Sequence, residues 1–207
     1  MGRHIVTVAR QFGCGGGEIA KKLAELLSVE YFDKELLEKA AEASGISKDA
    51  FERADERAAS SFLYSLAMSS YSGHISPVGV NDVMLSDKLF TVQSDAIRKL
   101  AAEKDCVIVG RCADYILAGR DNTINVFVYA PRETRVNRIM ARRNLSEAEA
   151  LKAITTSDKE RGNHYFRYTD QKWGKAQNYD ICINSALMGI EKTAEMLTAM
   201  AKIEVRA

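Results

Sequence analysis

The chain has 207 residues, of which 46% are hydrophobic and 28% charged, and its formal net charge at pH 7 is +1. This length fits one domain with a sizeable core, and the balanced charge argues against nucleic-acid or membrane binding driven by bulk charge. No apolar run approaches the roughly 20 residues of a membrane span, and the first residues are polar, so we expect a cytoplasmic protein. The four cysteines stand singly, which indicates neither a zinc site nor a disulfide framework.

The N-terminal part of the chain predicts a strand, a glycine-rich turn and a helix. A β-branched run over residues 5–8 indicates the strand, and apolar residues spaced along 19–27 indicate the helix. Glycine permits positive φ, and the N–H groups at the start of a helix attract anions. We therefore expect a phosphate-binding loop, with a dinucleotide-binding turn and a purely structural turn as alternatives. Its residues are Gly13, Cys14, Gly15, Gly16, Gly17 and Glu18.

The remaining elements alternate between strands and helices. Strands are expected over 29–32, 106–110, 123–130 and 179–184. Helices are expected over 36–43, 47–71, 81–104, 131–144, 147–163 and 190–203, with a loop over 69–80. Ser146 and Glu149 form a capping box for the helix that begins at 147. This alternation predicts an α/β fold in which helices cover both faces of a parallel sheet.

One single arginine and one group of arginines are placed to contact an anion. Arg111 follows the strand 106–110, and ligands of open parallel sheets bind at the carboxyl ends of strands. A surface salt bridge with Asp114 is the alternative for this residue. Arg135, Arg138 and Arg142 share one helix face, which indicates either a polyanionic partner or a solvated basic face.

A third cluster lies further along the chain, where Asp158 and Arg161 are one helical turn apart. Arginine binds phosphate oxygens in a bidentate manner, and a nearby aspartate can orient it or accept a hydrogen bond from a base or sugar. The alternative is an ordinary helix ion pair.

Five segments in this order resemble the nucleoside monophosphate kinases, and in detail the cytidylate kinase-like family. They are residues 10–25, 31–41, 107–117, the arginine-rich helix with 158–161, and 178–191, so the resemblance covers nearly the whole chain. It implies a three-layer P-loop kinase fold that transfers the γ-phosphoryl group of ATP, with Mg²⁺, to a nucleoside monophosphate such as CMP. It also implies one domain over 1–207, with a core of 1–33, 81–130 and 178–207, a helical acceptor-binding insert over 34–80, and an arginine-rich lid over 131–177.

The resemblance also implies roles for single residues. The loop glycines would hold the donor phosphates, and Asn184 and Ser185 would lie beside the adenine. Asp33, Lys39 and Arg111 would bind the acceptor, as would the pair Asp158 and Arg161. Arg138, Arg142 and Arg143 would belong to the lid.

The loop departs from the family pattern. Proficient cytidylate kinases carry a lysine and a hydroxyl residue where this chain has Gly16 and Glu18, and an aspartate where it has Cys112. We expect Arg10 to replace the lysine as the loop cation unless it pairs with a nearby carboxylate. We expect Glu18 to be a magnesium ligand, although it would repel phosphate at close range.

The expected partners are a nucleotide and a small phosphate acceptor, without nucleic acid or membrane, and a homodimer is left open. Two other functions are left open as well. A non-catalytic nucleotide-binding or sensing protein would keep the loop and lid without turnover. A dinucleotide-dependent oxidoreductase would use Asp33 on the ribose hydroxyls.

Overall fold

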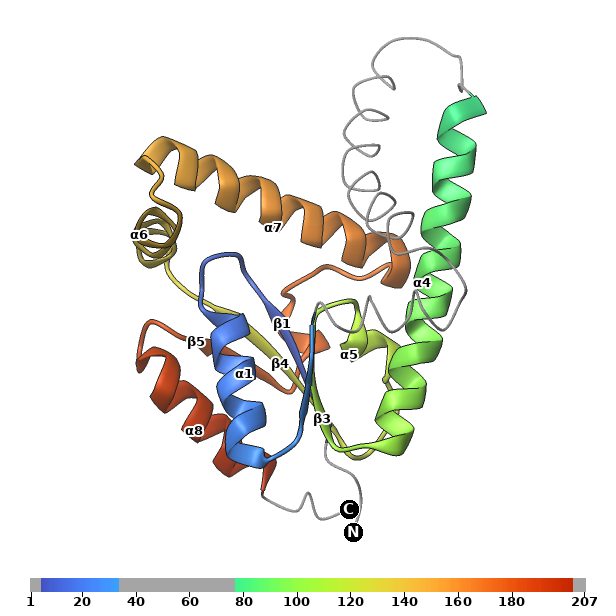
Figure 1. Cartoon of the computed structure of the whole chain (residues 1–207), viewed down its shortest axis with the longest axis horizontal. Helices are drawn as coiled ribbons and strands as arrows, with labels where there is room; N and C mark the ends of the chain where they lie inside the picture. Colours follow the sequence, from blue (N-terminus) through green and yellow to red (C-terminus); the bar gives the residue numbers. More distant parts are fainter. Residues whose placement is uncertain (1–4, 34–76, 203–207) are drawn as a thin grey trace. The chain divides into compact units, whose positions relative to one another are not determined.

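The computed structural model describes residues 5–33 and 77–202 of the chain (Figure 1). It divides into two compact units, one made of residues 1–33 and 100–207 and the other of residues 34–99. The expected helices over 36–43 and 47–71, and Lys39, lie outside the described residues.

The first unit is built on a five-stranded sheet in which all paired strands are parallel, in the order β2-β3-β1-β4-β5. The central strand β1 pairs Val8 with Val109 on one side and with Val126 on the other. The carboxyl ends of these strands therefore lie at one edge of the sheet, and the predicted parallel α/β architecture is confirmed. The strands are β1 (Ile5–Arg10), β2 (Glu30–Phe32), β3 (Cys106–Val109), β4 (Thr123–Tyr129) and β5 (Ile181–Asn184).

Helices α1 (Gly16–Leu27) and α8 (Gly189–Ala201) lie side by side on one face of the sheet (Figure 1). Ile19 and Leu23 of α1 are fully buried against valines of the central strands, together with Leu197 of α8. Burial of each such side chain stabilises the fold by about 1.5–3 kcal/mol. The start of α1 is therefore held firmly at the end of β1.

The opposite face of the sheet is covered differently. Phe127 of β4 packs against Trp173 and Tyr179, with ring centroids 5.3 and 5.0 Å apart. Two short helices that the sequence analysis did not predict are α5 (Ala113–Ile116) and η1 (Ala176–Asn178). Such single turns are too short for a periodic apolar pattern.

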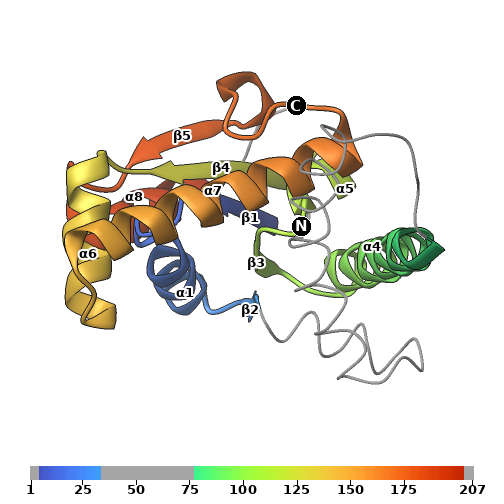
Figure 2. The same ribbon diagram turned by 90° about the horizontal axis from the view of Figure 1, so that it is seen from above.

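Helices α6 (Arg132–Arg143) and α7 (Glu147–Thr169) are joined by a short turn and cross each other, and α7 runs across the carboxyl edge of the sheet (Figure 2). The capping box of Ser146 and Glu149 is confirmed. The predicted end of α7 at 163 is wrong, because the helix continues to Thr169. Tyr165 and Thr169 are buried in the added turns, and this packing outweighs the low helix propensity of Gly162.

Helix α4 spans Pro77–Glu103, so the predicted loop over 69–80 is wrong for residues 77–80. Proline suits the first position of a helix, because the N–H that it lacks has no partner there. The final helix and the strands differ from their predicted bounds by only a few residues.

Candidate active site

A glycine-rich loop joins β1 to α1 at the carboxyl edge of the sheet. Gly13 and Gly15 both have φ of +81°, a conformation that side chains disfavour. No side chain among the described residues caps α1, whose N-terminus opens on this loop. The Cys14 thiol is buried beneath the loop and donates to the carbonyl of Val128 at 3.3 Å, and burial raises its pKa. The N-terminus of α1 is therefore not capped by a described side chain, and helix N-termini attract anions.

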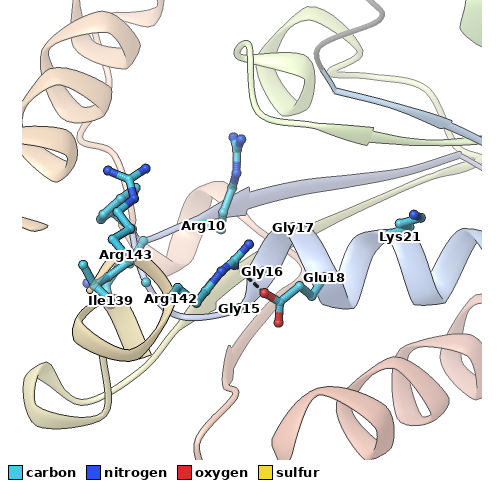
Figure 3. Close-up of a pocket in the computed structure, with 12 residues that line it drawn as sticks. Arg10, Gly15, Gly16, Gly17, Glu18, Lys21, Ile139, Arg142 and Arg143 are labelled. Atoms are coloured by element: carbon cyan, nitrogen blue, oxygen red, sulfur yellow. Dashed lines mark hydrogen bonds and ion pairs between the residues drawn. The ribbon is translucent and has the colours of Figure 1, made fainter. Parts of the chain in front are cut away.

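A cavity of about 550 Å³ opens over this loop (Figure 3). Its side chains carry four cationic groups and one carboxylate, so the cavity suits a polyanion. It is lined by Gln11, Phe12, Gly13, Gly15, Gly16, Gly17 and Glu18 of the loop and helix start, by Arg10 and Lys21, and by Ile139, Arg142 and Arg143 of α6. Four of these lining residues were not predicted from the sequence: Gln11, Phe12, Lys21 and Ile139. The spacing of Lys21, one helical turn after Glu18 on α1, could have indicated that both side chains lie on the same helix face.

The place of the missing loop lysine is filled by the stem of Arg10. A Cβ atom at Gly16 would lie 2.5 Å from the Cβ of Arg10 and 3.0 Å from its Cγ. The guanidinium head does not fold back over the loop as expected: it lies over Gly110 and pairs with Asp33 at 3.5 Å. Burial lowers the pKa of Arg10, and Asp33 opposes that shift. The structure therefore matches the alternative hypothesis, in which Arg10 pairs with a nearby carboxylate.

We expect that Gly16→Lys will not rebuild a conventional loop. The new side chain would collide with the stem of Arg10, and overpacking of this kind costs about 1–3 kcal/mol. Urea denaturation should show this loss. Gly17→Ala should not show it, because a Cβ at Gly17 would meet no atom within 4 Å beyond its chain neighbours and the backbone of its own helix. A Gly16→Lys protein of unchanged stability would contradict the interpretation.

Glu18 is held by two arginines of α6. Arg138 donates to its Oε2 at 2.9 Å. Arg142 donates to its Oε1, a contact that is drawn in Figure 3. Both carboxylate oxygens are engaged by guanidinium groups, which does not fit the expected role as a direct magnesium ligand. The residues described also contain no cluster of three His, Cys, Asp or Glu side chains that could hold a metal ion.

Asp158 of α7 contacts both the loop and helix α6. Its Oδ1 accepts from the N–H of Phe12 at 2.7 Å, and its Oδ2 accepts from Arg135 at 2.5 Å. Arg135 also donates to the carbonyl of Phe12 at 3.2 Å, and only 11% of its side chain is exposed. Asp158 therefore pairs with Arg135 across two helices, and this contact fixes the position of the loop.

A second arginine cluster lies where β1 and β3 end. Arg161 donates to the carbonyl of Arg10 at 2.7 Å, and burial, followed by the charge of Arg10, lowers its pKa to about 10. Arg111 lies at the carboxyl end of β3, two residues after Val109. Gly110, Arg111 and Cys112 take positive φ in succession in this turn. Arg10 interacts electrostatically with both Arg111 and Arg161 across this edge, and Asp33 lies beside Arg10.

Asp114 and Cys112, which follow the end of β3, are both buried. Asp114 is buried and accepts from the hydroxyl of Tyr165 at 2.6 Å, so it is not part of an exposed surface pair. Burial and the charge of Asp114 raise the pKa of Cys112 to about 12. Its thiol is therefore neutral and does not replace the charge of the family's aspartate.

The turn after β5 packs against the loop. Ser185 donates to the carbonyl of Cys14 at 2.6 Å, and the side-chain oxygen of Asn184 accepts from the N–H of Ala186 at 3.0 Å. Ser185, one of the two residues expected beside the adenine, thus borders the loop expected to bind phosphate.

A family model described as the cytidylate kinase-like family matches residues 5–187. The chain belongs to the cytidylate kinase-like family. It is 22% identical over 197 residues to a cytidylate kinase of Ignicoccus hospitalis, covering 95% of this chain and 98% of the relative. The family and the kinase fold support a nucleotide kinase in general.

Two solved structures share the fold. A protein from Eubacterium ventriosum has 28% identity and a TM-score of 0.73, with 98% of this chain and 100% of the other covered. A shikimate kinase from Bacteroides thetaiotaomicron has 15% identity and a TM-score of 0.52, with 97% and 99% covered, which shows the fold alone. Among the described residues, no helix is long and apolar enough to cross a membrane.

Proposed function

We propose that this protein transfers the γ-phosphoryl group of ATP to the phosphate of a nucleoside monophosphate of the CMP type, or to a related small acceptor. The observation that carries the proposal is a glycine loop at the edge of a parallel sheet, with arginines of α6 lying over it. Phosphoryl transfer depends mainly on positioning and on neutralising charge, and this arrangement supplies both.

The donor side consists of the loop and α6. The N–H groups at the start of α1 would bind the donor phosphates, and Arg138 and Arg142 would neutralise their charge. A Cβ at Gly15 would lie 2.5 Å from Nη1 of Arg138, so this guanidinium already lies against the loop backbone. We therefore assign the role of the missing loop cation to Arg138 in place of Arg10.

The acceptor side consists of the arginines where β1 and β3 end. Arg10, Arg111 and Arg161 would bind the acceptor phosphate, and Asp33 would orient Arg10. An oxygen of this phosphate would attack the γ-phosphorus, and the bond to the ADP oxygen would break. The products are ADP and a nucleoside diphosphate. Any magnesium would arrive on the nucleotide, because Mg²⁺ keeps most of its waters and binds substrate phosphates.

A phosphoryl-transfer assay tests the proposal. The full chain is incubated with ATP and MgCl₂ and with CMP, UMP, AMP, GMP or shikimate in turn, and the products are separated by anion-exchange chromatography. We expect ADP to form together with a diphosphate of the pyrimidine nucleotide. Binding of ATP without transfer to any acceptor would overturn the proposal.

The second candidate is a non-catalytic nucleotide-binding or sensing protein. The absence of a lysine at Gly16 and the carboxylate at Glu18 favour it, because both changes remove parts of the usual transfer machinery. The third candidate, a dinucleotide-dependent oxidoreductase, has less support. The Asp33 that it needs on the ribose pairs with Arg10, and the strand order differs from that of dinucleotide-binding sheets.

A further inference from the structure

Two sets of ion pairs that differ in burial lie where helices α6 and α7 meet the glycine loop and the start of α1. The inner set joins Arg135 to Asp158, and their side chains are only 11% and 20% exposed. The outer set joins Glu18 to Arg138 and Arg142, and here the exposed fractions are 39%, 27% and 62%. Water and small anions can therefore reach the outer set more readily than the inner one.

The outer set lies at the cavity. Glu18 and Arg142 both line it, and the guanidinium of Arg138 lies against Gly15. A carboxylate that binds two guanidinium groups resembles one end of a phosphate group in charge and hydrogen-bonding geometry. Glu18 thus provides, from within the chain, an anionic partner for two arginines of α6 that lie beside the loop and the cavity.

We infer that Glu18 is a built-in competitor for the donor polyphosphate. In the absence of nucleotide its carboxylate holds Arg138 and Arg142, and binding of the donor transfers both arginines from Glu18 to phosphate oxygens. This inference rests on the proposed function, since it assigns the donor phosphates to the loop. It makes Glu18 a positioning residue that sets donor affinity, with no covalent role.

Charge accounts for the direction of the effect. Glu18 lies in the first turn of α1, where the phosphates would bind, and like charges repel at such short range. Each donor molecule must therefore displace the carboxylate and bind beside it. Removal of the negative charge should tighten binding, although it also removes two ion pairs of the nucleotide-free protein.

The test compares wild type, Glu18→Gln and Glu25→Gln by titration calorimetry. Glu25 is an exposed carboxylate of the same helix for which no ion pair is seen among the described residues, so its variant matches the change in net charge. The probe is inorganic tripolyphosphate, first with EDTA and then with MgCl₂. Wild type must break two exposed ion pairs, each worth about 0.2–1 kcal/mol, when tripolyphosphate binds. Glu18→Gln does not have to break them, so its affinity for tripolyphosphate should be roughly 2- to 30-fold higher.

We expect this gain with and without magnesium, and we expect it to shrink in about 1 M salt, where the screening length is about 3 Å. Glu25→Gln should bind as wild type does. Unchanged or weaker binding by Glu18→Gln would overturn the inference. Loss of only the magnesium-dependent binding would also overturn it, because Glu18 would then be a metal ligand. Glu18→Ala should agree in direction with Glu18→Gln.

The two proposals fail in different ways. If wild type transfers phosphate but Glu18→Gln binds tripolyphosphate no more tightly, only the competitor role fails. If Glu18→Gln binds more tightly but wild type transfers phosphate to no acceptor, the kinase proposal fails and the competitor role stands. If neither protein binds tripolyphosphate and wild type transfers phosphate to no acceptor, both proposals are wrong.

Discussion

Replacement of Arg138 by alanine should weaken ATP binding by roughly 10- to 150-fold, because a hydrogen bond to a charged group is worth about 1.5–3 kcal/mol. The guanidinium of Arg138 lies against Gly15 and is 2.9 Å from Glu18, so its loss removes a cation from the loop. It also leaves the Glu18 carboxylate partly uncompensated beside the phosphates. The measurement is ATP affinity by calorimetry, together with the rate of ADP formation.

Two further variants make this experiment specific. Arg132→Ala removes an exposed arginine from the start of the same helix and should leave ATP affinity close to that of wild type. Arg138→Lys keeps the charge without the planar fork of the guanidinium group, and we expect an intermediate affinity. An Arg138→Ala protein that binds ATP as wild type does would remove this arginine from the donor site.

Replacement of Asp158 by alanine should lower the free energy of unfolding by about 3 kcal/mol, the lower end of the range for breaking a buried ion pair. The substitution leaves Arg135 buried without its carboxylate and deprives the Phe12 N–H of its acceptor. The measurement is urea denaturation monitored by Trp173 fluorescence. This residue packs against Phe127 of the central sheet and therefore reports on unfolding of the first unit.

Asp158→Asn separates the two contributions, since its side-chain oxygen can still accept from Phe12 while the charge is lost. We expect Asp158→Asn to lower the free energy of unfolding by about half as much as Asp158→Ala. Glu160→Ala, which removes a partly exposed carboxylate from the same helix, should change stability by less than about 0.5 kcal/mol. If Asp158→Ala lowers activity at unchanged stability, then Asp158 contacts substrate and does not primarily anchor the loop.

The elements next to strong local signals could be predicted from the sequence. The strand, glycine loop and first helix follow from β-branched residues, glycines and helical spacing within about twenty residues. The start of α7 follows from its capping box. The end of α7 could not be predicted in this way, because the packing of Tyr165 and Thr169 outweighs the glycine at 162.

The candidate site was predicted in its composition but not in its pairings. The glycine loop, the arginines of α6 and Asp158 were all identified as site residues, and the structure brings them together. The expectation that Arg10 covers the loop did not match the geometry. Its sequence position places the stem correctly, but the direction of the head depends on Asp33 and Gly110, which come from other strand ends.

The sequence by itself determined the parallel α/β fold and the position of the loop at the edge of the sheet, because short-range periodicity and glycine placement control both. Only the tertiary structure decided which charges meet. Arg138 and Arg142 contact Glu18 across 120 and 124 residues of chain, and Asp158 reaches back across 146 residues to Phe12. Ion pairs of this kind depend on how helices cross in space, and no local pattern of residues specifies that crossing.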